Sequence, residues 1–348
     1  MRLRFSLLLI CGLLYLSCNN EVVVTAPYQE RTLITGILES NKDVQFIRIQ
    51  KAFAQEGVSP FELALDPTNR FYADNELEVW VERVDNGIVT NRFDFEYIDG
   101  DTIGIIREEG LFPVSPNILY RYEGELPATG VYKLYVYNTN NLDTITASAS
   151  MVGDFNVLFP VPNQFGINVT DTGKIVYAGT YAVNARIYDL VLRMHYSELN
   201  PTTGLEEDKF KDWIMFSNIL GNNDAGSGTF AFEIRANTFY GFIRDAFQNE
   251  PERDREFKRL TYMFYAGGNE MYMLYLNNIA NLGLNELYAS TQYTNIDGGY
   301  GIFSSRHLES VDSVMLSNPS IDMLACDSAL QSFGFASSLA NPFYPECE

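Results

Sequence analysis

His195 and His307 are the only residues that could supply an imidazole for acid–base or nucleophilic catalysis. His195 alternates with Arg193 on the polar side of a predicted strand, and His307 directly follows Ser304-Ser305-Arg306. Neither lies near a G-x-S-x-G turn, the motif that exposes the nucleophilic serine in many hydrolases. We therefore predict no catalytic residue and a protein that is not an enzyme.

Paired carboxylates are the second kind of chemistry that the composition permits, because a glycosidase needs only two acids close in space. The densest acidic stretch is "DFEYIDGD", which contains Asp94, Glu96, Asp99 and Asp101. Its spacing does not match the D-x-[DN]-x-[DN]-G calcium loop, and Asp99-Gly100 is better explained as a turn. We predict no metal site here.

Three glycines late in the chain, Gly298, Gly299 and Gly301, could suggest a phosphate-binding loop. Such a loop needs a following lysine and the start of a helix, and neither is predicted at this point. The glycines fit a turn and a bulge between strands instead. We expect the protein to use no cofactor.

The first residues have the layout of a secretory signal, with Arg2 and Arg4 ahead of an apolar run that ends at Leu16. That run is too short to span a membrane as a helix. The following Ser17-Cys18 resembles the lipobox of bacterial lipoproteins, although Tyr15 stands where leucine is usual.

We expect residues 1–17 to be a lipoprotein signal peptide and residues 18–29 to be a tether that begins at an acylated Cys18. Several acyl chains anchor a protein stably where one chain does not. An ordinary signal peptide with an incidental cysteine is the alternative.

Cys326 and Cys347 are the two cysteines that remain once Cys11 leaves with the signal peptide and Cys18 is acylated. An exported compartment is oxidising, so we predict a disulfide between them that closes a C-terminal tail, residues 313–348. The loop-entropy relation gives this bridge about 3 kcal/mol. A zinc site is the alternative, but no histidine lies near these cysteines to complete it.

The chain is strongly acidic, with 45 Asp and Glu against 24 Lys and Arg and a formal net charge of −21. Removal of Arg2 and Arg4 with the signal peptide makes the mature chain more acidic still. Such a surface repels phosphate backbones and anionic headgroups. We therefore expect no nucleic-acid partner, and attachment to the membrane through the acyl group alone.

Alternating apolar and polar residues recur along the chain, and aromatics make up 14% of it. This pattern predicts an all-β fold of two β-sandwich-like domains, residues 30–158 and 159–312, the first immunoglobulin-like or transthyretin-like. One short helix, residues 237–249, is expected to pack on the second domain. Segments 260–279 and 293–308 are predicted to be strands.

The clearest predicted hairpin is "LEVWVERVDNGIVTNRFDFEY". A two-residue turn at Asn86-Gly87 would place Val81 opposite Arg92, so we predict a three-residue loop that pairs Val79 with Phe93. Trp80 and Arg92 then face each other on the polar side of the sheet. The structural interpretations are a cation–π pair or burial under the second domain, and the functional one makes Trp80 and Arg92 candidate ligand-stacking residues.

Three segments, "TASASMVGDFNVLFP", "NARIYDLVLRMHYSE" and "YTNIDGGYGIFSSR", together with the lipobox, resemble an uncharacterised family of Bacteroidota outer-membrane lipoproteins, catalogued as a domain of unknown function. The resemblance covers most of the mature chain and brings no established active residues. It implies an outer-membrane location and a TonB-dependent transporter, or another outer-membrane β-barrel, as partner. The resemblance also implies the cell surface rather than the periplasmic face, and the Asn-Asn-Glu after Cys18 departs from it as a weak version of the acidic surface-export signal of such lipoproteins.

The leading functional prediction is a non-catalytic lipoprotein that binds a ligand or a partner protein at the outer membrane. The first alternative is a fimbrial or adhesion subunit, which would polymerise by strand exchange after cleavage at Arg31. The second is a carboxylate-dependent hydrolase of exported substrates.

Overall fold

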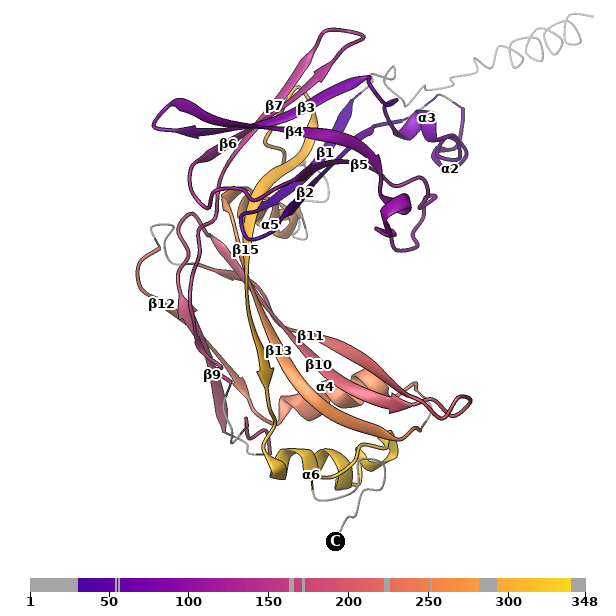
Figure 1. Cartoon of the computed structure of the whole chain (residues 1–348), viewed down its shortest axis with the longest axis vertical. Helices are drawn as coiled ribbons and strands as arrows, with labels where there is room; N and C mark the ends of the chain where they lie inside the picture. The colour runs from indigo at the N-terminus through magenta and orange to yellow at the C-terminus, as the bar shows by residue number, and fades with distance from the viewer. Residues whose placement is uncertain are drawn as a thin grey trace, which may run out of the picture.

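The structure is a computed structural model that describes residues 31–338, apart from residues 54, 56, 163–165, 171–172, 222–225, 251 and 282–292. Most of the described chain is β-strand, with a few short helices (Figure 1). Two separate hydrophobic cores lie inside the molecule. The predicted all-β class with sandwich-like packing and few helices is confirmed.

Among the described residues, the first unit contains seven consecutive strands, and the side chains of β1 and β3 alternate between buried and more exposed, as a sheet with one covered face requires. Strand β4 pairs with β3 near its start and with β5 near its end, which folds the sheet over the core. The fully buried Ile34, Val81 and Leu134 lie in that core. The strands are β1 (Thr32–Glu39), β2 (Val44–Lys51), β3 (Leu77–Asp85), β4 (Ile88–Asp99), β5 (Ile118–Glu123), β6 (Val131–Asn138) and β7 (Thr144–Ser150).

The hairpin of β3 and β4 differs from its predicted register. Asn86 and Gly87 both have positive φ, at 50° and 81°, so the turn has two residues. A β-bulge then adds one residue to β4, and Phe93 faces Val81 rather than the predicted Val79. The predicted three-residue loop is wrong, because the bulge shifts β4 by one residue and so places the apolar residues of β3 and β4 on the same side of the sheet after a two-residue turn.

The second unit packs two sheets against each other with the helices at one end. Helix α4 (Thr238–Phe247) lies within the predicted span 237–249 and buries Phe239, Ile243 and Phe247. The strands are β8 (Val157–Phe159), β9 (Lys174–Thr180), β10 (Ile187–Leu199), β11 (Glu206–Leu220), β12 (Thr229–Arg235) and β13 (Arg255–Gly267); helix α6 (Asn318–Cys326) and the short η2 (Gln331–Phe333) follow later in the chain.

One long strand, β15 (Tyr300–Val314), belongs to both units (Figure 1). Its first half pairs in parallel with β1, from Leu33 opposite Tyr300 to Glu39 opposite Arg306. Its second half pairs antiparallel with β13. The short β14 (Ile296–Asp297) pairs with β7. Residues 296–306, which the sequence placed in the second domain, therefore complete the first sheet.

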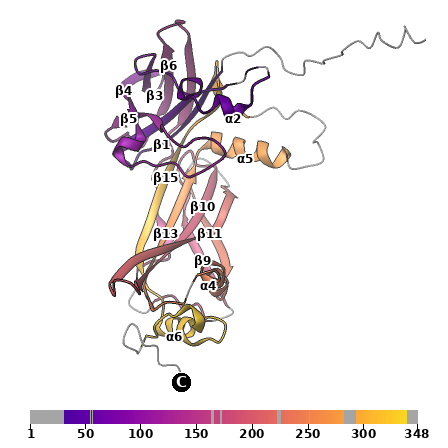
Figure 2. The same ribbon diagram turned by 90° about the vertical axis from the view of Figure 1, so that its right-hand side faces the viewer.

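The predicted strand 260–279 is correct only up to Gly267, where β13 ends. Helix α5 (Asn269–Asn281) follows, and Figure 2 shows it projecting from the body of the molecule. Its alternating methionines and tyrosines suggested a strand, although Gly267 and Gly268 interrupt the pattern before the helix begins. Among the described residues, no helix is long and apolar enough to cross a membrane.

Candidate functional site

The residues predicted to carry covalent modifications fall largely beyond the described part of the chain. Cys18, the signal peptide and the tether precede residue 31, and Cys347 follows residue 338. Cys326 is the last residue of α6. Acylation of Cys18 and the Cys326–Cys347 disulfide therefore stay predictions.

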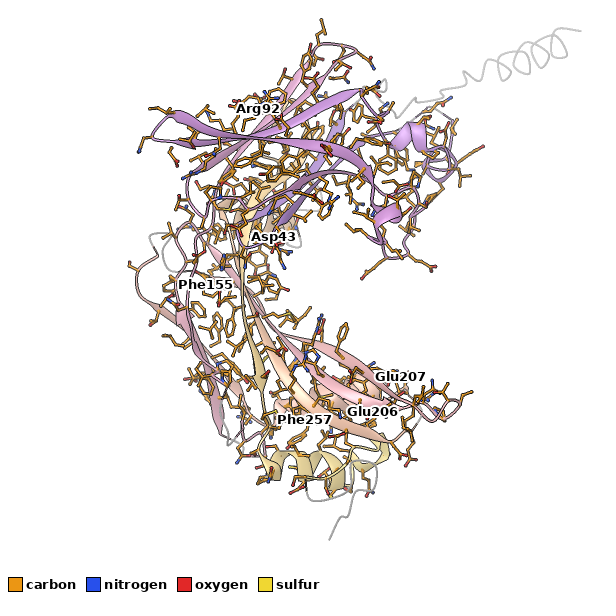
Figure 3. All side chains as sticks on the ribbon, in the orientation of Figure 1. Asp43, Arg92, Phe155, Glu206, Glu207 and Phe257 are labelled. Carbon is orange, nitrogen blue, oxygen red and sulfur yellow. The ribbon has the colours of Figure 1, made fainter. Side chains whose placement is uncertain are left out.

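Trp80 and Arg92 contact each other on the outer side of the first unit, where Figure 3 labels Arg92, but they do not face each other as predicted, because Trp80 lies opposite Asp94 and Arg92 opposite Glu82. The Arg92 guanidinium lies 4.4 Å from the Trp80 ring centroid, and the Tyr135 ring stacks on Trp80 with centroids 5.1 Å apart. Arg92 and Tyr135 come from the strands on either side of β3, so they cover opposite faces of the indole. This arrangement favours the structural interpretation, and the ligand-stacking role stays a prediction.

The two histidines have structural surroundings in the second unit. His195 Nε2 lies 2.9 Å from Thr261 Oγ1, and the Thr261 hydroxyl donates to Asp312 at 2.5 Å. Burial, followed by the charge of Arg259, lowers the pKa of His195. His307 is buried in β15, with Phe155 packed edge-on against its ring at 5.6 Å.

The acidic stretch that ends β4 stabilises a turn. Asp99 Oδ1 accepts hydrogen bonds from the backbone amides of Asp101 and Asn117, both at 3.1 Å. It thereby caps the short helix η1 (Gly100–Ile103), while Asp94 pairs with Arg92 at 2.8 Å. Within the described ranges, no three acidic, histidine or cysteine side chains are grouped to hold a metal ion.

A group of exposed apolar side chains, which we call the aromatic patch, lies on two loops of the first unit. The Phe112 ring contacts Phe53 edge-on at 5.8 Å and stacks on Phe61 at 5.5 Å between ring centroids. Phe61 is 54% exposed, Leu65 70% and Leu111 82%. The aromatic patch consists of Phe53, Phe61, Leu65, Leu111 and Phe112.

Local hydrogen bonds hold the two loops of the aromatic patch in place. Ser59 caps helix α2 (Pro60–Leu63), and Asp66 caps helix α3 (Pro67–Arg70). Hydrogen bonds from the Thr68 hydroxyl and amide lower the pKa of Asp66. Arg70 is almost fully buried and donates to the carbonyls of Pro113 and Ser115, at 2.9 and 3.0 Å, which fastens one loop to the other.

The aromatic patch adjoins the point where the chain enters the described fold. The amide of Ala52 donates to the carbonyl of Arg31 at 2.7 Å, and Ala52 directly precedes Phe53. Exposed carboxylates lie close to the patch residues along the chain, from Glu62, Asp66, Glu108 and Glu109. An exposed apolar centre with a charged rim is typical of a binding surface.

The sequence did not reveal the aromatic patch, because Phe112 is far along the chain from Phe53 and Phe61 and no short motif contains all three. The only local signal is a pair of long, irregular connections, between β2 and β3 and between β4 and β5. Such connections often carry function in β-sandwich proteins.

Comparison with known proteins assigns no family. No protein-family profile matches the chain, and no curated protein is similar to it. Among solved structures, the C-terminal globular domain of the oligosaccharyltransferase from Pyrococcus abyssi is 10% identical, with 66% of this chain and 44% of that chain covered and a TM-score of 0.26. The chicken CNTN1 FN1–FN3 domains are 11% identical, with 82% and 67% covered and a TM-score of 0.23. These two likenesses are too distant to support an argument about function.

Proposed function

We propose that the protein is an outer-membrane-anchored, non-catalytic lipoprotein that binds a partner protein through the aromatic patch. The observation that carries the proposal is the exposed aromatic patch beside Arg31. Burying Phe61, Leu65 and Leu111 against a partner stabilises a complex by roughly 25 cal/mol for each Å² of apolar surface removed from water.

The position of the aromatic patch relative to the proposed anchor supports this function. The segment from Cys18 to Arg31 extends at most about 45 Å when fully stretched. An acylated Cys18 therefore keeps the aromatic patch close to the membrane surface, among proteins that are embedded in the same membrane. High local concentration increases the occupancy of even a weak interface.

The rim indicates the chemistry of the partner. Glu62, Asp66, Glu108 and Glu109 are exposed and close to the patch residues along the chain, so we expect a complementary surface to have an apolar centre with Lys and Arg at its edge. An anionic lipid surface is a poor match for the same rim. The proposed partner is a TonB-dependent transporter or another outer-membrane β-barrel at the cell surface.

The two alternative functions gain no specific support. Strand β1 lies between β2 and β15 with Ile34 and Leu38 fully buried, and cleavage at Arg31 would leave β1 in place. Of the acids singled out for hydrolysis, Asp94 pairs with Arg92 and Asp99 caps η1.

Crosslinking in intact cells that make the protein, followed by detergent purification, tests the proposal. We expect one outer-membrane β-barrel to co-purify with the full-length chain in stoichiometric amounts. Recovery of no outer-membrane protein would overturn it.

A further inference from the structure

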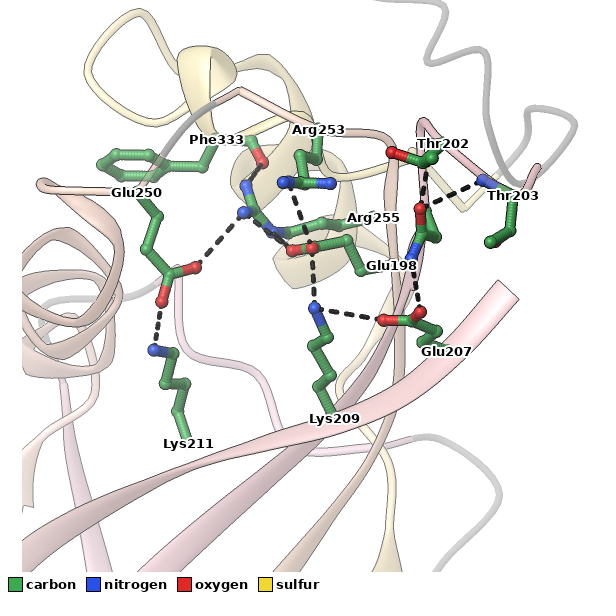
Figure 4. A network of polar contacts seen from close by, with 11 residues as sticks. Glu198, Thr202, Thr203, Glu207, Lys209, Lys211, Glu250, Arg253, Arg255 and Phe333 are labelled. Atoms are coloured by element: carbon green, nitrogen blue, oxygen red, sulfur yellow. Dashed lines mark hydrogen bonds and ion pairs between the residues drawn. The ribbon is translucent and has the colours of Figure 1, made fainter. Parts of the chain in front are cut away.

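A charged pocket with a volume of about 510 Å³ lies in the second unit, between β11 and the segment that joins α4 to β13. Figure 4 shows its charged side chains converging from different parts of the chain. We call it the charged pocket and define it by Glu198, Lys209, Lys211, Glu250, Arg253 and Arg255.

The floor of the charged pocket is a buried ion pair whose hydrogen bonds are satisfied. The side chains of Glu198 and Arg255 are 4% and 1% exposed, and Arg255 Nε donates to Glu198 Oε2 at 2.9 Å. Arg255 also donates to the Phe333 carbonyl at 2.7 Å and to Glu250 at 3.2 Å. This floor fastens the segment after α6 to the sheet, which is a structural role.

The wall of the charged pocket brings three further cations to the carboxylates of the floor. Lys209 and Arg253 both contact Glu198 Oε1, at 2.8 and 3.3 Å, in addition to the pair with Arg255. Lys211 pairs with Glu250. Four cations therefore line the pocket together with three carboxylates, those of Glu198, Asp208 and Glu250, and Glu207, 3.5 Å from Lys209, brings the charges into balance. In a chain with a formal net charge of −21, a pocket with as many cations as carboxylates is less acidic than the average surface.

Arg253 is the cation with unused donors. Its contact with Glu198 runs through Nε, and its side chain is 30% exposed. No described residue accepts a hydrogen bond from its two terminal amino groups. Two parallel N–H groups of a guanidinium can donate to the two oxygens of one carboxylate. The neighbouring Lys211, 29% exposed, adds a second positive charge at the opening.

We propose that the charged pocket binds a carboxylate group of an acidic ligand, with Arg253 as the bidentate donor and Lys211 as the supporting charge. Glu198 is neutralised by the cations around it, so it does not repel the incoming anion. The site is separate from the aromatic patch, and its occupation does not depend on the partner proposed above.

Isothermal titration of the full-length protein with matched pairs of probes tests this site. One pair is hexagalacturonate and its methyl ester, and the other is hexaalanine with a free or an amidated C-terminus, so the two arms separate an acidic saccharide from a peptide terminus. We expect one acid form to bind and its neutral counterpart not to bind. Binding of neither acid form, or equal binding of acid and neutral forms, would overturn the proposal.

Variants assign the binding to the charged pocket. Arg253→Gln is expected to weaken binding at least about tenfold, because a charge-assisted hydrogen bond is lost. Lys211→Gln should weaken it less. Arg259→Gln is the matched control, since Arg259 pairs with Asp312 at 3.1 Å and does not line the charged pocket. Thermal midpoints of all three variants report folding, and unchanged affinity in folded Arg253→Gln contradicts the assignment.

Discussion

Glu39 and Arg306 face each other in the parallel ladder of β1 and β15, and their side chains pair at 2.9 Å between Oε1 and Nη2. Arg306 also lies opposite Gly267 of β13, where the antiparallel ladder of the second unit begins. One residue thus belongs to the hydrogen-bonded sheets of both units. Because β15 is continuous through this point, the two units are joined by strand pairing.

Gly301 should be intolerant of any side chain. Its φ is +116°, and a Cβ would lie 1.9 Å from the Ile34 carbonyl oxygen in the parallel ladder. We expect Gly301→Ala to lower the free energy of unfolding by roughly 3 kcal/mol, measured by denaturant unfolding. Gly110→Ala, with nothing within 4 Å of its Cβ, is the control and should be near neutral. Equal stability of the two variants would contradict the close approach of β15 to β1.

Removing the buried carboxylate should be costly because it takes away the closer of the two carboxylates that pair with Arg255. In Glu198→Gln, Arg255 stays buried and loses the carboxylate at 2.8 Å while it keeps Glu250 at 3.2 Å, so we expect a loss of about 3 kcal/mol in the free energy of unfolding. Glu207→Gln removes an exposed partner of Lys209 and should leave the denaturation midpoint unchanged. If both variants unfold alike, the Glu198–Arg255 pair is not the centre of the network.

Stability should fall in acid through the same carboxylate. Burial acts to raise the pKa of Glu198, but the hydrogen bond from Lys209 and the charge of Arg255 outweigh burial and hold it below the usual 4.5. A pKa that is lower in the folded than in the unfolded protein gives stability that is complete above pH 4.5 and is lost as the pH falls through the folded value. The difference in thermal midpoint between wild type and Glu198→Gln should therefore shrink below pH 4.5. If the difference in thermal midpoint stays constant from pH 7 to pH 3, the loss of stability in acid does not come from Glu198.

Trp80 should matter for stability and not for partner binding. Trp80→Leu removes the stacking of Arg92 and Tyr135 on the indole, and we expect a loss of about 1–2 kcal/mol by denaturant unfolding. Crosslinking to the outer-membrane partner should be unaffected, because Trp80 lies on β3 and outside the aromatic patch. Loss of crosslinking in folded Trp80→Leu would restore the stacking role for this residue.

The sequence predicted the features that depend on neighbours along the chain. Alternation identified most strands, and helical spacing located α4. The Trp80–Arg92 contact was also predicted, although through the wrong hairpin register. A one-residue bulge in β4 has no distinct sequence signature. Without it, a two-residue turn at Asn86-Gly87 would pair Val81 with Arg92, and for that reason the two-residue turn was not predicted.

Features that depend on distant segments could not be read from the sequence. The assignment of β15 to both units requires β1, which is about 270 residues earlier, to lie beside it. The aromatic patch and the charged pocket each combine residues from separate loops and strands. Glu198 is one of 45 acidic residues in the sequence, and nothing in the sequence distinguishes it as the buried partner of Arg255.

The most direct test of the central claim is crosslinking with a disrupted aromatic patch. Phe61→Asp combined with Leu111→Asp places two charges in the proposed interface, and Leu142→Asp is the control at a residue that is 68% exposed in the turn after β6. With thermal midpoints matched, we predict that the double variant recovers at least about tenfold less of the outer-membrane β-barrel than wild type, and that Leu142→Asp recovers as much as wild type. Equal recovery by the double variant would contradict partner binding through the aromatic patch.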